Sequence, residues 1–85
     1  ETGEKTVYIQ LMKPDGEVML KPDYGSFPYQ NTTLDYSMRK YIEYDGEQQE
    51  VVMYWPVEEF LDAGTYSAFI FVDGVMIGET TFDLK

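Results

Sequence analysis

The amino-acid sequence predicts an all-β fold, an antiparallel β-sandwich of roughly six to seven short strands without a disulfide. Apolar and polar residues alternate with a period of two along most of the chain, which is the pattern of half-buried strands. Turn dipeptides such as Asp73-Gly74 separate these runs at short intervals. With 85 residues, 44% of them hydrophobic and 26% charged, the chain has the composition of one globular domain with one core.

The N-terminal third is predicted to hold strands separated by a tight turn and a loop. Val7, Ile9 and Leu11 alternate with polar or less apolar neighbours and mark the first strand. Pro14-Asp15-Gly16 predicts a turn, because proline presets one backbone angle and glycine accepts a positive φ. The expected elements are, in order, a strand at 7–12, a short strand at 17–21, a loop at 22–28 and a brief edge strand at 27–30.

The middle of the chain predicts one long strand over 33–44 and a second strand over 50–55. Lys40 interrupts the apolar face of the long strand, which a kink or an edge position would explain. Pro56 ends the second strand because it donates no hydrogen bond to a ladder, and 57–61 is expected to form a single helical turn. The apolar face of the long strand comprises Leu34, Tyr36, Met38, Ile42 and Tyr44.

The C-terminal third predicts a β-hairpin in which Asp73-Gly74 joins strands over 66–72 and 75–84. A two-residue turn would pair Val72 with Val75 and Ile70 with Ile77, all on the core face. A bulge near Gly78-Glu79 would then return the last apolar residues to that face. The predicted core comprises Val7, Ile9, Leu11, Leu34, Met38, Ile42, Tyr66, Ile70, Ile77 and Phe82.

Composition disfavours several classes of function. Sixteen acidic against six basic residues give a net charge of −10, which opposes binding to nucleic acid or to anionic lipid. The absence of cysteine and histidine removes zinc–thiolate sites, cysteine nucleophiles and the usual general base. No apolar run approaches the ~20 residues of a membrane span. We therefore expect no cofactor, no metal, no direct membrane insertion and no enzymatic activity.

Acidic clusters have a structural and a functional interpretation. Glu47, Glu50, Glu58-Glu59 and Asp62 are the candidates for paired acid–base catalysis, but charged residues in turns and on solvated faces are the ordinary outcome. Aspartates in or beside Gly-containing turns would suit a weak calcium site or turn formation alone, and turn formation is favoured. These aspartates are Asp15, Asp45, Asp62 and Asp73, and a glycosylation sequon lies at Asn31-Thr32-Thr33.

Residues 61–66 resemble the tyrosine corner of immunoglobulin-like and fibronectin-like sandwiches. Asp62-Ala63-Gly64-Thr65-Tyr66 is similar to the Asp-x-Gly-x-Tyr pattern, in which the tyrosine hydroxyl bonds a backbone group upstream. Ala68 stands where antibody-type domains carry a cysteine, so no intersheet disulfide is expected. The resemblance implies an immunoglobulin-like sandwich over 5–85 with a structural corner at Leu61, Gly64 and Tyr66. The polar start of the chain separately predicts a flexible segment at 1–4.

The chain also resembles small β-sandwich modules in envelope and surface proteins of Bacteroidetes-type bacteria. The resemblance is carried by the opening strand and turn over Val7 to Gly16 and by the closing pattern over Gly64 to Leu84. It implies export to the periplasm, the cell envelope or the extracellular space, a place within a larger protein, and no particular activity.

Aromatic residues are abundant enough that some should lie at the surface. Eight tyrosines, five phenylalanines and one tryptophan exceed the needs of one small core. The outward face of the last hairpin would carry a protein contact or self-association through Phe69, Phe71 and Met76, extended by Tyr54, unless other parts of the chain cover it. We therefore expect a non-catalytic protein-interaction or spacer module. The alternative is carbohydrate binding by stacking on Tyr24, Tyr29, Tyr54 or Trp55.

Overall fold

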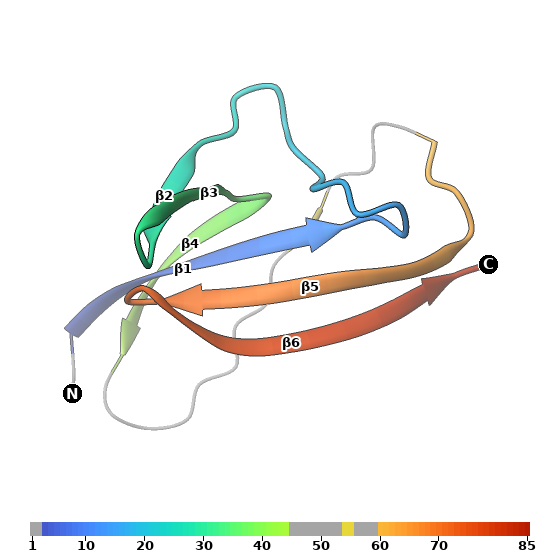
Figure 1. The fold of residues 1–85 in the computed structure, drawn as a ribbon. Helices are drawn as coiled ribbons and strands as arrows, with labels where there is room; N and C mark the ends of the chain where they lie inside the picture. The colour runs from blue at the N-terminus through green and yellow to red at the C-terminus, as the bar shows by residue number, and fades with distance from the viewer. Residues whose placement is uncertain (1–2, 45–53, 56–59) are drawn as a thin grey trace.

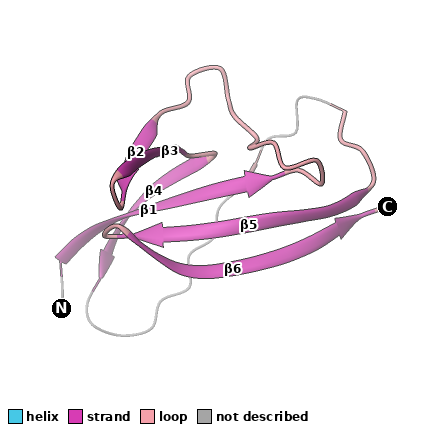
Figure 2. Ribbon diagram, viewed as in Figure 1, coloured by secondary structure: helices cyan, strands magenta, loops and turns pink. Residues whose placement is uncertain are grey.

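The computed structural model describes residues 3–44, 54–55 and 60–85, and these form an all-β fold (Figures 1 and 2). One antiparallel sheet has the strand order β4-β1-β5-β6, and β2 and β3 form a second antiparallel sheet. None of the described residues belongs to a membrane-spanning helix. The six strands are β1 (Gly3–Met12), β2 (Ser26–Tyr29), β3 (Thr32–Asp35), β4 (Met38–Tyr44), β5 (Gly64–Val72) and β6 (Val75–Leu84).

Strand β1 lies inside the larger sheet, and its alternating side chains define the two faces of that sheet. Tyr8 lies opposite Phe71 of β5, and directly opposed residues of antiparallel strands point to the same face. We call this the β2–β3 face, because the smaller sheet covers it. The other face, to which Leu11 and Tyr66 point, is called the corner face.

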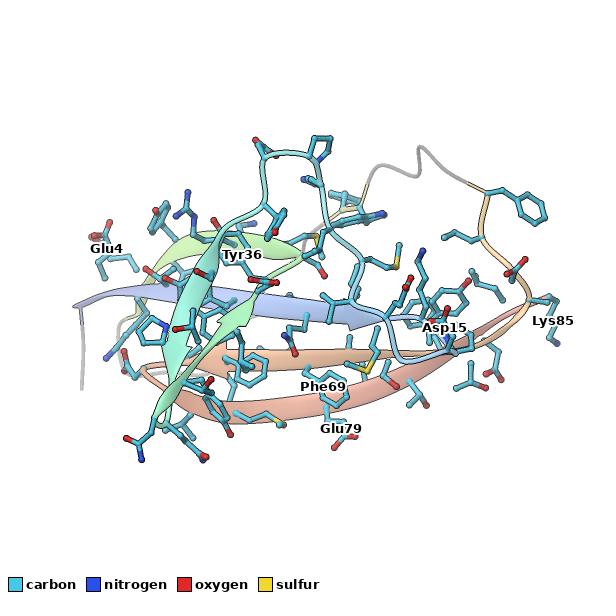
Figure 3. All side chains as sticks on the ribbon, turned by 45° about the horizontal axis from the view of Figure 1, so that its top comes forward. Glu4, Asp15, Tyr36, Phe69, Glu79 and Lys85 are labelled. Carbon is cyan, nitrogen blue, oxygen red and sulfur yellow. The ribbon has the colours of Figure 1, made fainter. Side chains whose placement is uncertain are left out.

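The β2–β3 sheet packs on the larger sheet through aromatic rings, and Figure 3 shows it lying across the strands beneath. Phe27 of β2 stacks on Tyr8, with ring centroids 4.5 Å apart, and lies 5.1 Å from the Phe71 ring. Tyr29 meets Phe71 edge-on at 5.1 Å. Phe27 and Phe71 are each only 2% exposed. This aromatic contact is therefore the core on the β2–β3 face.

The corner face carries a second buried cluster. Leu11, Met19 and Tyr66 form its centre and are 8%, 4% and 1% exposed. Met19 comes from the loop after β1, where its amide donates a 2.7 Å hydrogen bond to the Leu11 carbonyl oxygen. Partly buried residues that pack against this centre are Ile9, Met38, Trp55, Leu61, Ala68 and Leu84. Both faces of the sheet therefore bury side chains.

The chain passes from one sheet to the other at Tyr36-Ser37, between β3 and β4. The Ser37 amide donates to the Ile9 carbonyl oxygen, and the Ser37 hydroxyl oxygen accepts a 2.8 Å hydrogen bond from the Leu11 amide. The Gln10 side-chain amide donates to the Asp35 carbonyl oxygen at 2.8 Å. Ser37 and Gln10 are buried, so these bonds satisfy polar groups that water does not reach.

The ring of Tyr36 lies close to the backbone of Gly25, next to the point where the chain passes between the sheets. A Cβ atom at Gly25 would lie 2.7 Å from the Tyr36 hydroxyl oxygen, closer than nonbonded atoms approach. The Tyr36 amide donates a 3.1 Å hydrogen bond to the Gly25 carbonyl oxygen, and the Tyr36 ring lies 5.3 Å from that of Tyr8. A side chain at position 25 would therefore displace the Tyr36 ring.

Several elements predicted from the sequence are confirmed. The first strand, the Pro14-Asp15-Gly16 turn and the brief strand near Phe27 are present, with β1 beginning earlier than the predicted 7–12. Gly16 has φ 90°, as the turn requires. The predicted flexible segment at 1–4 is too long, since Gly3 and Glu4 already pair with β4.

Other predicted elements are wrong. Residues 17–21 form no strand and make only an isolated bridge between Met12 and Val18, because the backbone then turns to bury Met19. The single strand over 33–44 is two strands in different sheets, separated at Tyr36-Ser37. Lys40 is exposed on the edge strand β4, which agrees with the edge alternative.

The predicted strand over 50–55 and the helical turn over 57–61 lie mainly outside the described residues. Tyr54 and Trp55 are described and belong to no strand. Phe60 and Leu61 are described and are not helical.

The last hairpin is confirmed, with a different register beyond its turn. Asp73 and Gly74 have φ 54° and 77°, and Val72 pairs with Val75. The predicted pair of Ile70 with Ile77 is wrong, because the bulge lies one position earlier than expected. Phe71 pairs with Met76 and Ile70 with Gly78, so Ile77 is the extra residue.

The predicted core is correct in part. Val7, Leu11 and Tyr66 are buried, whereas Ile77 and Phe82 are 62% and 41% exposed. Both exposed residues lie on β6, which has a neighbouring strand on one side only among the described residues. The remaining predicted core residues, Ile9, Leu34, Met38, Ile42 and Ile70, are half-buried. Buried residues that the sequence analysis missed are Gln10, Met19, Phe27, Ser37 and Phe71.

We predict that Phe71→Ala lowers the free energy of unfolding by about 3–5 kcal/mol, because it removes a buried ring from the contact with Phe27 and leaves a cavity. Phe69→Ala is the matched control, since Phe69 lies on the same face of β5 but is only half-buried. Urea denaturation measures both. A larger loss for Phe69→Ala would contradict this description of the core.

We predict that Ser37→Ala lowers the free energy of unfolding by about 1–3 kcal/mol, because it leaves the buried Leu11 amide without its acceptor. Ser67→Ala is the control, since Ser67 lies on β5 away from this transition and is less buried. Chemical denaturation gives the two free energies. Hydrogen exchange of the Leu11 amide should accelerate in Ser37→Ala, and an unchanged exchange rate would contradict the assigned bond.

Candidate functional site

The candidate site is a row of exposed apolar side chains on β6. Val75, Met76, Ile77 and Phe82 are 57%, 41%, 62% and 41% exposed, and we call these four residues the β6 edge. Strand β6 ends the order β4-β1-β5-β6 and is the outermost strand at its side of the sheet in Figure 1. Large apolar side chains gathered on one strand are typical of a contact surface.

The bulge in β6 determines which way these side chains point. Ile77 and Gly78 both lie opposite Ile70, so Ile77 points to the corner face together with Val75. A Cβ atom at Gly78 would lie 3.4 Å from Cδ1 of Ile70, which is an ordinary van der Waals contact. Phe82 also points to the corner face and stacks on Tyr66, with ring centroids 5.6 Å apart. Three of the four residues of the β6 edge therefore share one face.

The predicted partner-binding set of Phe69, Phe71, Met76 and Tyr54 does not form one exposed surface. Phe71 is buried under the β2–β3 sheet, so its assignment to an exposed contact is wrong. Internal coverage, the alternative considered for this face, applies at Phe71. Phe69 is half-buried beside Glu79, as Figure 3 shows, and Met76 is exposed opposite Phe71.

Tyr54 is 84% exposed but belongs to a different part of the surface. The next residue, Trp55, packs against the Leu11–Met19–Tyr66 cluster, which lies on the corner face. Phe69 and Met76 point to the β2–β3 face, so the sheet separates them from this segment.

Sequence reasoning missed Val75 and Ile77 as surface residues because it assigned them to the core. The available signal was their position in the last strand, directly after a two-residue turn. The turn guarantees that such a strand pairs with the strand before it. If no other strand pairs with its second side, it lies at the edge of the sheet, where apolar side chains are more exposed.

The tyrosine corner has the geometry that the sequence predicts. The Tyr66 hydroxyl donates a 2.7 Å hydrogen bond to the Asp62 carbonyl oxygen, and Leu61 packs against the buried cluster. Gly64 has φ 145°, and a Cβ atom there would lie 2.8 Å from Cγ of Pro14. The corner therefore joins the start of β5 to the turn after β1.

Two of the described aspartates use their carboxylates in a turn hydrogen bond and in an ion pair. The Asp15 carboxylate accepts the Glu17 amide at 3.0 Å, and the Asp73 carboxylate pairs with the Lys5 ammonium at 2.7 Å. No group of three or more metal-ligating side chains occurs in the part of the chain that the structure describes. The candidates Asp45, Glu47, Glu50 and Glu58-Glu59 lie outside the described residues.

An open cavity of about 250 Å³ lies between the turn after β1 and the corner. Its lining includes Lys13, Asp15 and Asp62, with the buried Tyr66 at its base. Asp15 and Asp62 are exposed and Lys13 is half-buried, and the Asp15 carboxylate accepts a hydrogen bond from the Glu17 amide. The lining therefore combines two exposed carboxylates with one ammonium group.

The candidates for sugar stacking fall into two groups. Tyr24 and Tyr54 are 51% and 84% exposed, so their rings are accessible. Trp55 is half-buried against the core, with the Lys21 ammonium 5.4 Å from its ring centroid. Tyr29 contacts Phe71 edge-on and is half-buried. Only the two exposed tyrosines offer open ring faces.

Comparison with known proteins assigns the chain to a family. The model of a domain of unknown function (DUF8428) matches residues 1–85, and the chain belongs to this family. No curated protein and no solved structure matches the chain. The family description names no activity, substrate or partner.

We predict that Tyr66→Phe lowers the free energy of unfolding by about 0.5–1.5 kcal/mol, because it removes the hydrogen bond to Asp62 and keeps the ring in place. Tyr24→Phe is the control, since the Tyr24 side chain is half-exposed. Thermal and urea unfolding measure both. Equal midpoints for Tyr66→Phe and the wild type would contradict a stabilising role of the corner bond.

Proposed function

We propose that this member of the DUF8428 family is a non-catalytic module of a larger exported or envelope protein, and that it binds another protein through the β6 edge. The observation that carries the proposal is the exposure of four large apolar side chains on one terminal strand. Single exposed apolar residues are ordinary, but several on one strand, three of them on one face, are typical of an interaction surface.

The charge of the domain supports selective contact at this strand. A net charge of −10 keeps most of the surface hydrated. The β6 edge itself contains no charged residue, although Glu79 and Asp83 lie on the same strand. An apolar centre with charged residues around it is the usual composition of a protein–protein interface.

The proposed architecture is an immunoglobulin-like sandwich. Support comes from two antiparallel sheets in aromatic contact and from the Tyr66–Asp62 bond of the corner. In the immunoglobulin arrangement the strand after the corner lies between the last and the third strands. Here β5 lies between β6 and β1, so the proposed likeness concerns the layered architecture and the corner, not the strand order.

The proposed location outside the cytoplasm, in the periplasm, the envelope or the extracellular space, rests on the resemblance of residues 7–16 and 64–84 to bacterial surface modules. A spacer role is the simplest form of the same proposal: a rigid two-sheet domain holds neighbouring parts of the protein apart. The β6 edge is what favours a binding role over spacing alone.

Carbohydrate binding is the second candidate, and the exposure of Tyr24 and Tyr54 favours it. Aromatic rings with open faces stack on the apolar faces of sugars. The two tyrosines are not in ring contact with each other, and neither lies on the β6 edge. The two proposed functions therefore use separate residues and are separable by mutation.

We predict that the immobilised chain retains a specific protein from an envelope extract of its native host and that Val75→Lys with Ile77→Lys abolishes this retention. The double change places two lysine ammonium groups in the proposed interface, and burying these charges without partners opposes binding. Both residues are more than half exposed, so the fold should tolerate lysine there. Mass spectrometry of the eluate identifies the retained protein.

The matched control is Tyr24→Ala with Tyr54→Ala, which should leave protein retention unchanged. A glycan array with the same three proteins tests the second candidate. Glycan binding that the tyrosine variant loses and the lysine variant keeps would contradict the protein-contact proposal in favour of sugar binding. A chain that retains neither protein nor glycan would indicate a spacer.

A further inference from the structure

The two outer strands of the four-stranded sheet differ in how they are protected from pairing. Strand β4 carries Arg39, Lys40 and Glu43, charged residues of the kind that discourage pairing with another chain. Strand β6 spans ten residues, contains no lysine, arginine or proline, and carries two charged residues, Glu79 and Asp83. All of its residues except Gly78 and Leu84 are exposed. Among the described residues β6 pairs only with β5, which leaves one side of its backbone open.

An open strand edge presents a row of amide and carbonyl groups that another strand satisfies by main-chain hydrogen bonds. The bulge at Ile77 is the only interruption within β6. From Gly78 to Leu84 the pairing with β5 is regular, so that segment has the extended geometry that a further strand requires.

We propose that the occupant of the open β6 strand is the β6 strand of a second copy of this chain, antiparallel and related by a two-fold axis at Thr80. This inference rests on the proposed contact role of the β6 edge and names its partner. The two four-stranded sheets would then form one continuous sheet across the dimer, a common way to close an isologous interface.

The side chains on the corner face are complementary in this register. Phe82 of one copy lies opposite Gly78 and the bulged Ile77 of the other, where the absence of a side chain at Gly78 leaves room for the ring. Leu84 of one copy lies opposite Val75 of the other. Both relations follow from the faces that the β5–β6 pairing assigns, and they occur twice in the dimer by symmetry.

The charged residues are compatible with the same register. Glu79 lies opposite Thr81 of the second copy, and Asp83 lies opposite Met76, so no two carboxylates are directly opposed. A shift by one residue would place side chains of opposite faces against each other. A shift by two residues moves the axis to Thr81, which places Glu79 opposite Asp83 of the second copy, or to Glu79, which places the two Glu79 carboxylates opposite each other. The axis at Thr80 pairs the whole strand.

The net charge makes the proposed association dependent on salt. Each copy carries −10, and the repulsion between copies weakens as ions screen it. We expect sedimentation equilibrium of the full chain to give a species of twice 9.9 kDa whose dissociation constant falls as salt is raised from about 0.01 M to about 1 M. A wild type that stays monomeric throughout this range overturns the proposal.

Cysteine scanning tests the register, and the chain has no native cysteine to interfere. Thr80→Cys places two thiols opposite each other across the axis, within about 4.5–5.5 Å between Cβ atoms, from which a small backbone shift forms a disulfide. Thr81→Cys is the matched control, because Thr81 is equally exposed and points to the other face, opposite Glu79 rather than itself.

Under mild oxidation Thr80→Cys should give a covalent dimer that reductant dissolves, and Thr81→Cys should remain mostly monomeric. Equal cross-linking of the two variants would overturn the proposed strand pairing. The same holds if Thr80→Cys forms no disulfide in a sample that sedimentation shows to be dimeric. Circular dichroism of each variant checks that the fold is kept. A monomeric wild type that still retains a host protein through the β6 edge would reject the second copy as partner and leave the proposed contact function intact.

Discussion

The abrupt change of direction at Tyr36-Ser37 determines the arrangement of the two sheets. The Ser37 hydroxyl and amide hold the start of β4 against β1, while Gln10 holds the end of β3 from the same strand. Because both ends of the transition are tied to β1, the β2–β3 hairpin folds back over the larger sheet. The placement of Phe27 on Tyr8 and the burial of Phe71 both follow from this return.

Two small cores on opposite faces of one sheet follow from that arrangement. On the β2–β3 face the packing is mainly aromatic, whereas on the corner face it is a mixed cluster around Tyr66. A chain of 85 residues has few side chains for each face. Strand β6 lies at the margin of the sheet, where Leu84 and Phe82 contact the corner-face cluster and Val75, Met76 and Ile77 are left exposed. The candidate contact surface is thus a consequence of how the limited core is distributed.

The aromatic residues were expected to lie partly in the core and partly at the surface, and the structure shows which residue lies where. Phe27, Phe71 and Tyr66 are buried, while Tyr24, Tyr54 and Phe60 are more than half exposed. Alternation alone does not distinguish these cases, since it shows which residues share a face of a strand and not what covers that face. The difference arises from which neighbours each strand has, and those neighbours come from distant parts of the sequence.

The sequence by itself determined the all-β class, the opening strand and turn, the last hairpin and the corner hydrogen bond of Tyr66. These features depend on residues close together in the chain: Asp73-Gly74 accepts positive φ, and Tyr66 reaches a carbonyl four residues away. Only the tertiary structure decided the break at Tyr36-Ser37, the burial of Phe71 and the exposure of Val75 and Ile77. Each of these depends on strand order and on contacts between segments far apart in sequence, which local periodicity does not encode.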